Sequence, residues 1–231
     1  MLKTKKTVIP VSKTIGDVSG LLVVPNEPEA ILVLAHGAGA GMAHPFMEKI
    51  SQGLEARRIA TLRYQFPYME RGNKRPDVPT IAVATVVAAL DHAKTLFPDV
   101  PLFGGGKSFG GRMTSTAAAE KKIPGFRGIV FFGFPLHPPG QPGTKRGEHL
   151  KKVDVPMLFL QGTRDTLADL RLLKPLCRKL GEKATLHILD AANHSFNVQK
   201  TSGRTDEDVM QELTDATVDW ILTRSKEPAR K

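Results

Sequence analysis

Five residues near the middle of the chain have the types and spacing needed for nucleophilic chemistry. Gly106-Lys107-Ser108-Phe109-Gly110 follows the pattern Gly-x-Ser-x-Gly, in which a serine stands at the apex of a tight turn from a strand into a helix. The strained turn exposes the serine hydroxyl, and the helix N-terminus directs free N–H groups at an oxyanion that forms beside it. The pattern therefore indicates that Ser108 is a nucleophile.

Two other interpretations of this stretch compete with the first. A glycine-rich turn without any chemistry gives the same pattern and stays open at this point. A phosphate loop also ends in Gly-Lys-Ser, but it requires glycine where this chain has Pro101. The later apolar run 128–132 leads into Gly133 rather than into an acidic residue that could hold magnesium. The phosphate-loop interpretation is therefore disfavoured.

A serine nucleophile needs a base that takes its proton and a carboxylate that orients the base. Asp165 is the first acidic residue after Ser108 that follows an apolar run and a turn signal, whereas Asp169 and Asp190 are weaker candidates. His194 stands in a polar loop after the last apolar run, and His187 lies within that run. The order serine, acid, histidine, each at the end of a strand, predicts a triad of Ser108, Asp165 and His194.

The remaining candidates surround this triad. The backbone N–H groups of Phe109 and Ala38 are predicted to form an oxyanion hole, with Gly39 as the alternative to Ala38. Gly39 and His137 are also candidate substrate-binding residues, and His36 is expected to support the glycine-rich loop 36–41. The histidines and the cysteine show no spacing typical of metal ligands. We therefore expect neither a metal nor another cofactor.

The elements that must position these residues follow from hydrophobic periodicity and turn signals. Strands are predicted over residues 7–11, 18–24, 31–35, 59–64, 102–105, 126–132, 157–161 and 184–189. Helices are predicted over residues 45–57, 80–97, 113–120, 167–180 and 206–223, and loops over 69–79 and 135–153. Strands that alternate with helices indicate an α/β fold, a doubly wound, mostly parallel sheet with helices on both faces. We expect a single domain over residues 1–231, with a disordered tail at 225–231.

Composition limits the classes of protein that the chain can represent. It has 231 residues, of which 41% are apolar, and Cys177 is its one cysteine, so no disulfide can form within it. No signal peptide or run of about 20 apolar residues is visible, and a cytoplasmic location without membrane attachment is expected.

The net charge of +10 fits a solvated basic surface or anionic substrates. Because aromatic residues do not interleave with the basic clusters, nucleic-acid binding is not expected. The sequence does not indicate an oligomeric state.

Six segments together resemble a known family. The chain is similar to the α/β-hydrolase superfamily, in its small, lidless, dienelactone-hydrolase-like form. More closely it resembles an uncharacterised group of predicted α/β-hydrolases whose relatives include a chromatin-complex subunit of animals. The matching segments are His36-Gly37-Ala38-Gly39-Ala40-Gly41, Arg63-Tyr64-Gln65-Phe66-Pro67-Tyr68, Gly106-Lys107-Ser108-Phe109-Gly110-Gly111-Arg112, Gly133-Phe134-Pro135-Leu136-His137-Pro138-Pro139-Gly140, Gln161-Gly162-Thr163-Arg164-Asp165 and Asn193-His194-Ser195-Phe196.

The resemblance implies a soluble serine hydrolase without a cofactor, an esterase that acts on a small ester or thioester. Dienelactone hydrolases have cysteine as nucleophile where this chain has Ser108, so the resemblance does not carry over their substrate. Segment 135–153 is too short for a helical cap domain, and the site is therefore expected to be open and walled by loops. The alternative from another class is a binding or scaffold protein that keeps the hydrolase fold without turnover.

Overall fold

A single eight-stranded sheet organises the computed structural model, which describes residues 4–120 and 123–227. The spatial order of the strands is β1-β2-β4-β3-β5-β6-β7-β8. Their bounds are β1 (Lys5–Ser12), β2 (Gly16–Val23), β3 (Ala30–Ala35), β4 (Ile59–Tyr64), β5 (Leu102–Lys107), β6 (Phe126–Phe132), β7 (Met157–Gly162) and β8 (Ala184–Leu189). β1 and β2 form an antiparallel pair, and β2 also runs antiparallel to β4. All other pairs are parallel.

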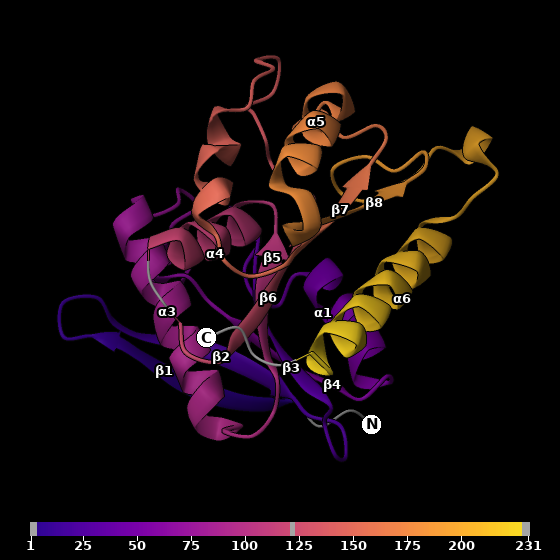
Figure 1. Cartoon of the computed structure of the whole chain (residues 1–231). Coiled ribbons are helices and arrows are strands. Elements are labelled where there is room, and N and C mark those ends of the chain that lie inside the picture. The colour runs from indigo at the N-terminus through magenta and orange to yellow at the C-terminus, as the bar shows by residue number, and fades with distance from the viewer. Residues whose placement is uncertain (1–3, 121–122, 228–231) are drawn as a thin grey trace.

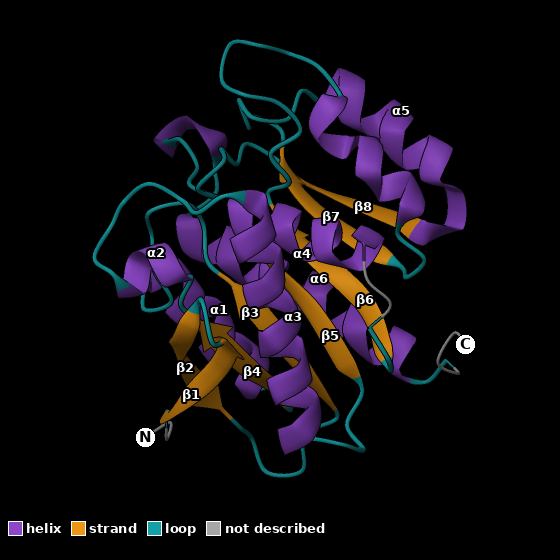
Figure 2. Ribbon diagram, turned by 90° about the vertical axis from the view of Figure 1, so that its left-hand side faces the viewer, coloured by secondary structure: helices purple, strands orange, loops and turns teal. Residues whose placement is uncertain are grey.

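The parallel strands carry their apolar residues as continuous runs because helices cover both faces of the sheet. α3 (Pro79–Leu96), α4 (Phe109–Glu120) and α5 (Leu170–Leu180) pack on one face, and α1 (Pro45–Glu55) and α6 (Asp206–Ser225) pack on the other. Figure 1 shows the α3–α4 layer and the α1–α6 layer on opposite sides of the strands. In Figure 2 the helices α3 and α4 lie in front of the sheet.

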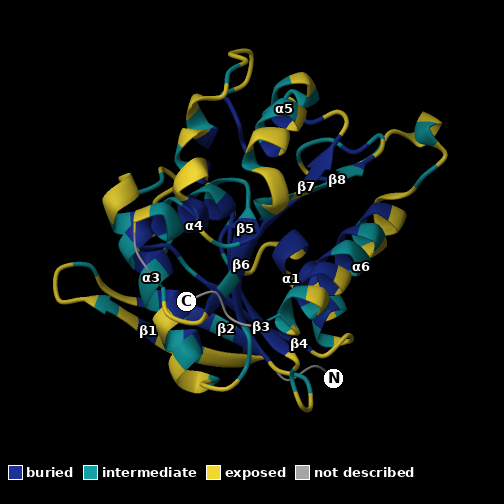
Figure 3. Ribbon diagram, viewed as in Figure 1, coloured by how far each residue is buried: buried dark blue, intermediate teal, exposed yellow. Residues whose placement is uncertain are grey.

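Each helical layer forms a separate hydrophobic cluster with one face of the sheet. β3, β4, β5, β6 and β7 contribute buried residues to both clusters, since successive side chains point to opposite faces. Figure 3 shows the strands buried and the outer helix faces exposed. The core therefore lies in two layers, and the carboxyl ends of the parallel strands open onto one edge of the sheet, where ligands bind in sheets of this kind.

The predicted fold class is confirmed, and in the described residues the segment after β6 holds only the 3₁₀ helix η1 (Lys145–Lys152). This short element is not a cap domain, as expected. The predicted loops were wrong in two places, because α2 (Pro67–Glu70) overlaps the start of one loop and η1 lies in the other. Both elements are a few turns or less, too short for a periodic pattern to emerge.

Several helix ends also differ from the prediction, and side-chain hydrogen bonds lie at two of them. α5 begins at Leu170 rather than at residue 167, because the Asp169 side chain accepts the Arg171 N–H and caps the helix there. Ser225, the first residue of the predicted tail, is the last residue of α6, and Arg127 donates to the carbonyl oxygen of Glu227. The rest of the predicted tail, residues 228–231, lies outside the described residues.

Candidate active site

The turn between β5 and α4 holds Ser108 in strained backbone. Ser108 has a φ of +49°, a left-handed conformation that non-glycine residues rarely adopt. Its N–H donates to the Phe132 carbonyl oxygen (3.1 Å), and its own carbonyl accepts the first helical bond, from Arg112 N–H (3.1 Å). A Cβ at Gly110 would lie 2.5 Å from the Ala35 carbonyl oxygen. The glycine therefore lets the helix approach β3, and the serine is left at the apex.

Three side chains from distant parts of the chain meet at this apex. The Ser108 Oγ lies 2.9 Å from His194 Nε2, and His194 Nδ1 lies 2.7 Å from Asp165 Oδ2. In a neutral imidazole this arrangement is satisfied when Nδ1–H donates to the carboxylate and Nε2 accepts the serine O–H. The structure thus brings together the three residues predicted as a triad, in the order that base catalysis at Ser108 requires.

The carboxylate of Asp165 is fixed from several sides. It is buried in the turn after β7, and its Oδ1 accepts the Leu167 N–H (2.8 Å). Gln161 donates its side-chain amide to Oδ2 and accepts the Phe134 N–H (3.0 Å) with its own oxygen. Gln161 was not predicted from the sequence as a supporting residue. A polar amide at the end of an otherwise apolar strand was the one signal for it.

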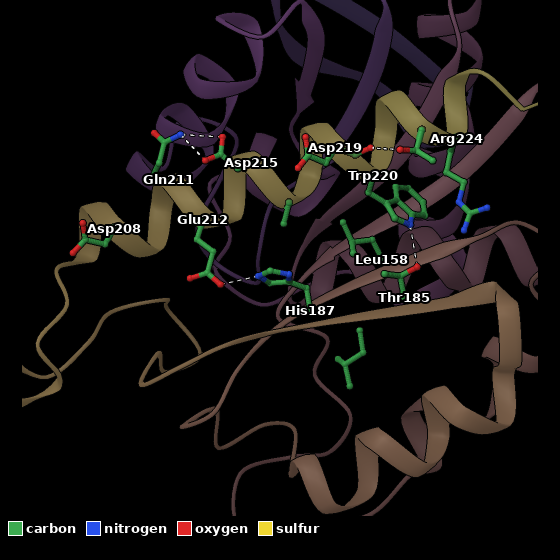
Figure 4. Close-up of a pocket in the computed structure, with 13 residues that line it drawn as sticks. Leu158, Thr185, His187, Asp208, Gln211, Glu212, Asp215, Asp219, Trp220 and Arg224 are labelled. Atoms are coloured by element: carbon green, nitrogen blue, oxygen red, sulfur yellow. Dashed lines mark hydrogen bonds and ion pairs between the residues drawn. The ribbon is translucent and has the colours of Figure 1, made fainter.

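The alternative acids and base lie elsewhere. Asp169 caps α5 and pairs with Arg171, and Asp190 accepts a long bond from Thr163 (3.4 Å). His187 Nε2 lies 2.7 Å from Glu212 of α6. Figure 4 shows these two side chains facing each other in a groove of about 690 Å³ between β8 and α6. That groove contains no triad residue, so His187 belongs to a separate surface.

The two backbone N–H groups predicted for the oxyanion hole have no acceptor among the described residues. Phe109 is the first residue of α4 and therefore has no intrahelical acceptor. Ala38 N–H donates to no group among the residues that the structure describes. The Gly39 N–H, by contrast, donates to the Tyr68 hydroxyl (3.0 Å). This bond favours Ala38 over Gly39 as the second oxyanion donor, and the role of both stays a prediction.

Both histidines of the surrounding loops are held by backbone groups. His36 Nδ1–H donates to the Gly37 carbonyl oxygen (2.7 Å), and its Nε2 accepts the Phe66 N–H (3.1 Å). Burial lowers the pKa of His36 to about 4, only partly offset by its hydrogen bond to Gly37, so the ring is neutral and supports its loop. His137 is engaged in the same way, with the Pro138 carbonyl (2.9 Å) and the Asp169 N–H (3.0 Å). A substrate-binding role of His137 stays a prediction.

Residues 4–120 and 123–227 show neither a metal site nor a membrane-spanning helix. No group of three or more His, Cys, Asp or Glu side chains is placed to hold a metal ion there. Each helix in the described part of the chain is too short or too polar to cross a lipid bilayer. Cys177 is buried and unbonded, and burial raises its pKa to about 11.

Comparisons with known proteins define the class to which this site belongs. The model of the alpha/beta hydrolase domain family matches residues 28–222, and the chain is a member of that family. The structure is similar to a dienelactone hydrolase from Anabaena variabilis, with a TM-score of 0.75, 20% identity and coverage of 96% of this chain and 98% of that one. It is also similar to a lidless α/β serine hydrolase from Xanthomonas campestris, with a TM-score of 0.72, 16% identity and coverage of 94% and 95%. At these identities the likeness shows the fold.

A curated relative extends beyond the matched region. The chain is 25% identical over 209 residues to a Mycobacterium tuberculosis protein whose name proposes phosphoribosyl transferase activity. The match covers 89% of this chain but only 43% of that protein, so the chain spans less than half of the relative's length. The expected link to a chromatin-complex subunit stays a prediction.

Proposed function

We propose that the protein is a serine hydrolase that cleaves a small ester or thioester through an acyl-enzyme intermediate. The observation that carries this proposal is the continuous hydrogen-bonded chain from the Ser108 hydroxyl through the His194 ring to the buried Asp165 carboxylate. A scaffold protein would have no need for all three groups in this order at a strained turn. The proposed partner is a small acyl substrate, and the domain extent and cytoplasmic location stay predictions.

The proposed reaction has two halves, acylation of Ser108 and hydrolysis of the acyl-enzyme. Ser108 attacks the substrate carbonyl carbon while His194 Nε2 takes the hydroxyl proton, and Asp165 stabilises the imidazolium that forms. The Phe109 and Ala38 N–H groups stabilise the negative oxygen of the tetrahedral intermediate. His194 then gives the proton to the leaving alcohol or thiol, and the acyl group remains on Ser108. Water, deprotonated by His194, attacks the carbonyl carbon of this acyl-enzyme. The bond between that carbon and Ser108 Oγ then breaks, His194 returns the proton to Oγ, and the carboxylic acid leaves.

We do not extend phosphoribosyl transfer to this chain. The segment that resembles a phosphate loop, Gly106-Lys107-Ser108, forms the end of β5 and the serine turn. Its glycine and its backbone N–H groups therefore form part of the strand and of the turn that leads into α4.

The decisive experiment combines covalent labelling with turnover. We expect a fluorophosphonate probe to label the wild-type protein on Ser108, and p-nitrophenyl acetate and butyrate to be hydrolysed. Ser108→Ala removes one hydroxyl at the apex, so it is expected to abolish both reactions while the unfolding midpoint stays within a few degrees. Ser195→Ala, which removes a neighbouring hydroxyl outside the hydrogen-bonded chain, is the matched control and keeps both reactions. Labelling of Ser108→Ala, or an inert wild-type protein, would refute the proposal, and the inert case would favour the scaffold.

A further inference from the structure

The residue before the nucleophile is in contact with the histidine loop. We propose that Lys107 is a positioning residue: its ammonium group fixes the loop that carries His194, and so holds the imidazole between Ser108 and Asp165. The functional part of this inference rests on the proposed serine hydrolase activity, whereas the positioning itself is a property of the fold.

The contact joins segments that are far apart in sequence. Lys107 is the last residue of β5, and its Nζ donates to the carbonyl oxygen of His194 (2.5 Å). Besides the bond between Ser108 and His194, no other hydrogen bond in the described part of the chain joins residues 102–110 to residues 190–198. Lys107 therefore ties the backbone of the base to the strand that carries the nucleophile.

Two aromatic rings surround the same ammonium group. Its Nζ lies 4.9 Å from the ring centroid of Phe196 and 5.9 Å from that of Phe46 in α1, which is within cation–π range. The two rings stack on each other, with their centroids 5.6 Å apart and their planes at 18°. Since Phe196 is buried and only two residues beyond His194, the lysine contacts the loop at both its carbonyl and its apolar anchor.

The histidine loop has hydrogen bonds of its own and others to neighbouring elements. Its own bonds run within it: Asn193 Oδ1 accepts the N–H groups of Ser195 (2.9 Å) and Asn197 (3.0 Å), and the Asn193 carbonyl accepts Phe196 N–H (2.9 Å). Phe196 also has a φ of +66°, a conformation that costs free energy in a non-glycine residue. Other bonds join the loop to the turn after β7 and to α6: the Ala192 carbonyl accepts the Arg164 N–H (2.9 Å), His194 Nδ1 lies 2.7 Å from Asp165 Oδ2, and Asp206 accepts the Val198 N–H (2.8 Å). None of these bonds joins the loop to β5, the strand that leads to Ser108. Lys107 supplies that connection.

Burial makes the charged form of Lys107 less favourable than that of an exposed lysine. Burial lowers the pKa of its ammonium group to about 8, opposed by the nearby Asp165 carboxylate. Asp165 and the His194 ring are the titratable groups that face it, and Phe46 of α1 and Phe196 contribute apolar rings. The group is therefore charged below pH 8 and neutral above it. Loss of the proton removes the cation–π attraction and leaves a weaker, neutral hydrogen bond to the His194 carbonyl.

The first test follows His194 directly, without turnover. The ¹H–¹³C signal of its Cε1–H group, identified by its absence in His194→Gln, is titrated in the Ser108→Ala background. We expect a step with a midpoint near pH 8 that reports Lys107 deprotonation, and its loss in both Lys107→Met and Lys107→Arg. Lys94→Met is the matched control, because Lys94 also donates to a backbone carbonyl, that of Pro98, but at the far end of α3. A step that persists in Lys107→Met, or a His194 Cε1–H signal at neutral pH that Lys107→Met leaves unchanged, would overturn the proposal.

The second test separates positioning from general stability. Lys107→Met is expected to lower kcat for p-nitrophenyl acetate by about 10- to 100-fold with KM changed less than about threefold, since a misplaced catalytic group costs rate rather than ground-state binding. Lys94→Met keeps the wild-type kcat. If Lys107→Met folds and keeps kcat, the positioning role is refuted. If the wild-type protein shows the step at pH 8 but hydrolyses no ester, the proposed function fails while the positioning by Lys107 stands.

Discussion

At the scale of single residues, the carboxylate of Asp165 is the most constrained group in the site. It accepts from the His194 ring, the Gln161 amide and the Leu167 backbone. Such a carboxylate holds the imidazole in one tautomer and stabilises the cation that forms during the reaction. An asparagine amide at this position keeps the shape of the carboxylate but can donate a hydrogen bond to His194 Nδ1. Nδ1 then carries no proton, and the ring proton lies on Nε2, where the serine hydroxyl needs an acceptor.

Asp165→Asn is therefore expected to lower kcat by up to about 10⁴-fold while the fold persists. The measurement is steady-state hydrolysis of p-nitrophenyl acetate, with circular dichroism to show the fold. Asp190→Asn serves as control, because among the described residues the Asp190 side chain accepts only a 3.4 Å bond from Thr163. This variant should stay within about twofold of wild type. If Asp190→Asn were the more damaging change, Asp165 would not be the acid of the site.

The residues of this site differ in how far the sequence could predict them. Ser108, Asp165 and His194 could be named because each follows a strand and the order of the three is informative. The supporting contacts of Gln161 and Lys107 could not be predicted. They join Gln161 to Phe134, 27 positions away, and Lys107 to His194, 87 positions away, and they depend on the face of the strand end from which each side chain leaves. Such contacts are set by packing of whole elements, for which one sequence has no local signal.

At the scale of elements, the β5–α4 turn depends on close approach of backbones. α4 begins at Phe109 and its first turn lies against β3, where the Ala35 carbonyl is in contact with Gly110. A Cβ at Gly110 would also lie 2.6 Å from the His36 carbonyl oxygen. Both of these atoms belong to the backbone, and neither can move away as a flexible side chain would.

Gly110→Ala is accordingly expected to destabilise the fold by about 1–3 kcal/mol, the usual cost of overpacking, and to displace the Phe109 N–H from the oxyanion position. Urea unfolding measures the first effect, and the rate of fluorophosphonate labelling measures the second. Gly143→Ala is the control, since a Cβ there meets nothing within 4 Å and its φ is not positive. Equal stability of the two variants would contradict the close approach.

The pattern of elements was predictable where burial is continuous. The strands 59–64 and 126–132 match β4 and β6 residue by residue, because apolar runs bounded by turn signals coincide with buried strands. The strand 184–189 also matches β8, although most of β8 is only half-buried. The start of α4 was missed since glycines in its first turn carry no helical signal. The antiparallel edge pair β1–β2 could be predicted from its short turn, whereas the position of β2 beside β4 is seen only in the structure.

At the scale of the whole molecule, the net charge of +10 is unevenly compensated. Arg71, in a loop expected to wall the site, pairs with Asp77 at a bond distance of 2.5 Å. Arg112 and Arg146 belong to no ion pair among the described residues. Burial, together with the neighbouring Arg146, lowers the pKa of Arg112, and its guanidinium lies 6.0 Å from the Phe109 ring centroid. Arg112, with Arg146 near it, therefore places positive charge one helical turn beyond Ser108.

Such a field is expected to attract anionic substrates to the site, which has no cap domain. We expect short acyl esters to be preferred and a carboxylate-bearing short ester to have a higher kcat/KM than its neutral analogue at low salt. The advantage should shrink in 0.5 M NaCl, because exposed charges are screened beyond about 8 Å already at physiological ionic strength. Arg146→Gln should reduce it at low salt, while Arg58→Gln, at the amino edge of β4 and paired with Glu27 and Glu29, should leave it unchanged. The same ratio of kcat/KM for the two esters at both salt concentrations, or a preference for long acyl chains, would show that these arginines do not face the substrate.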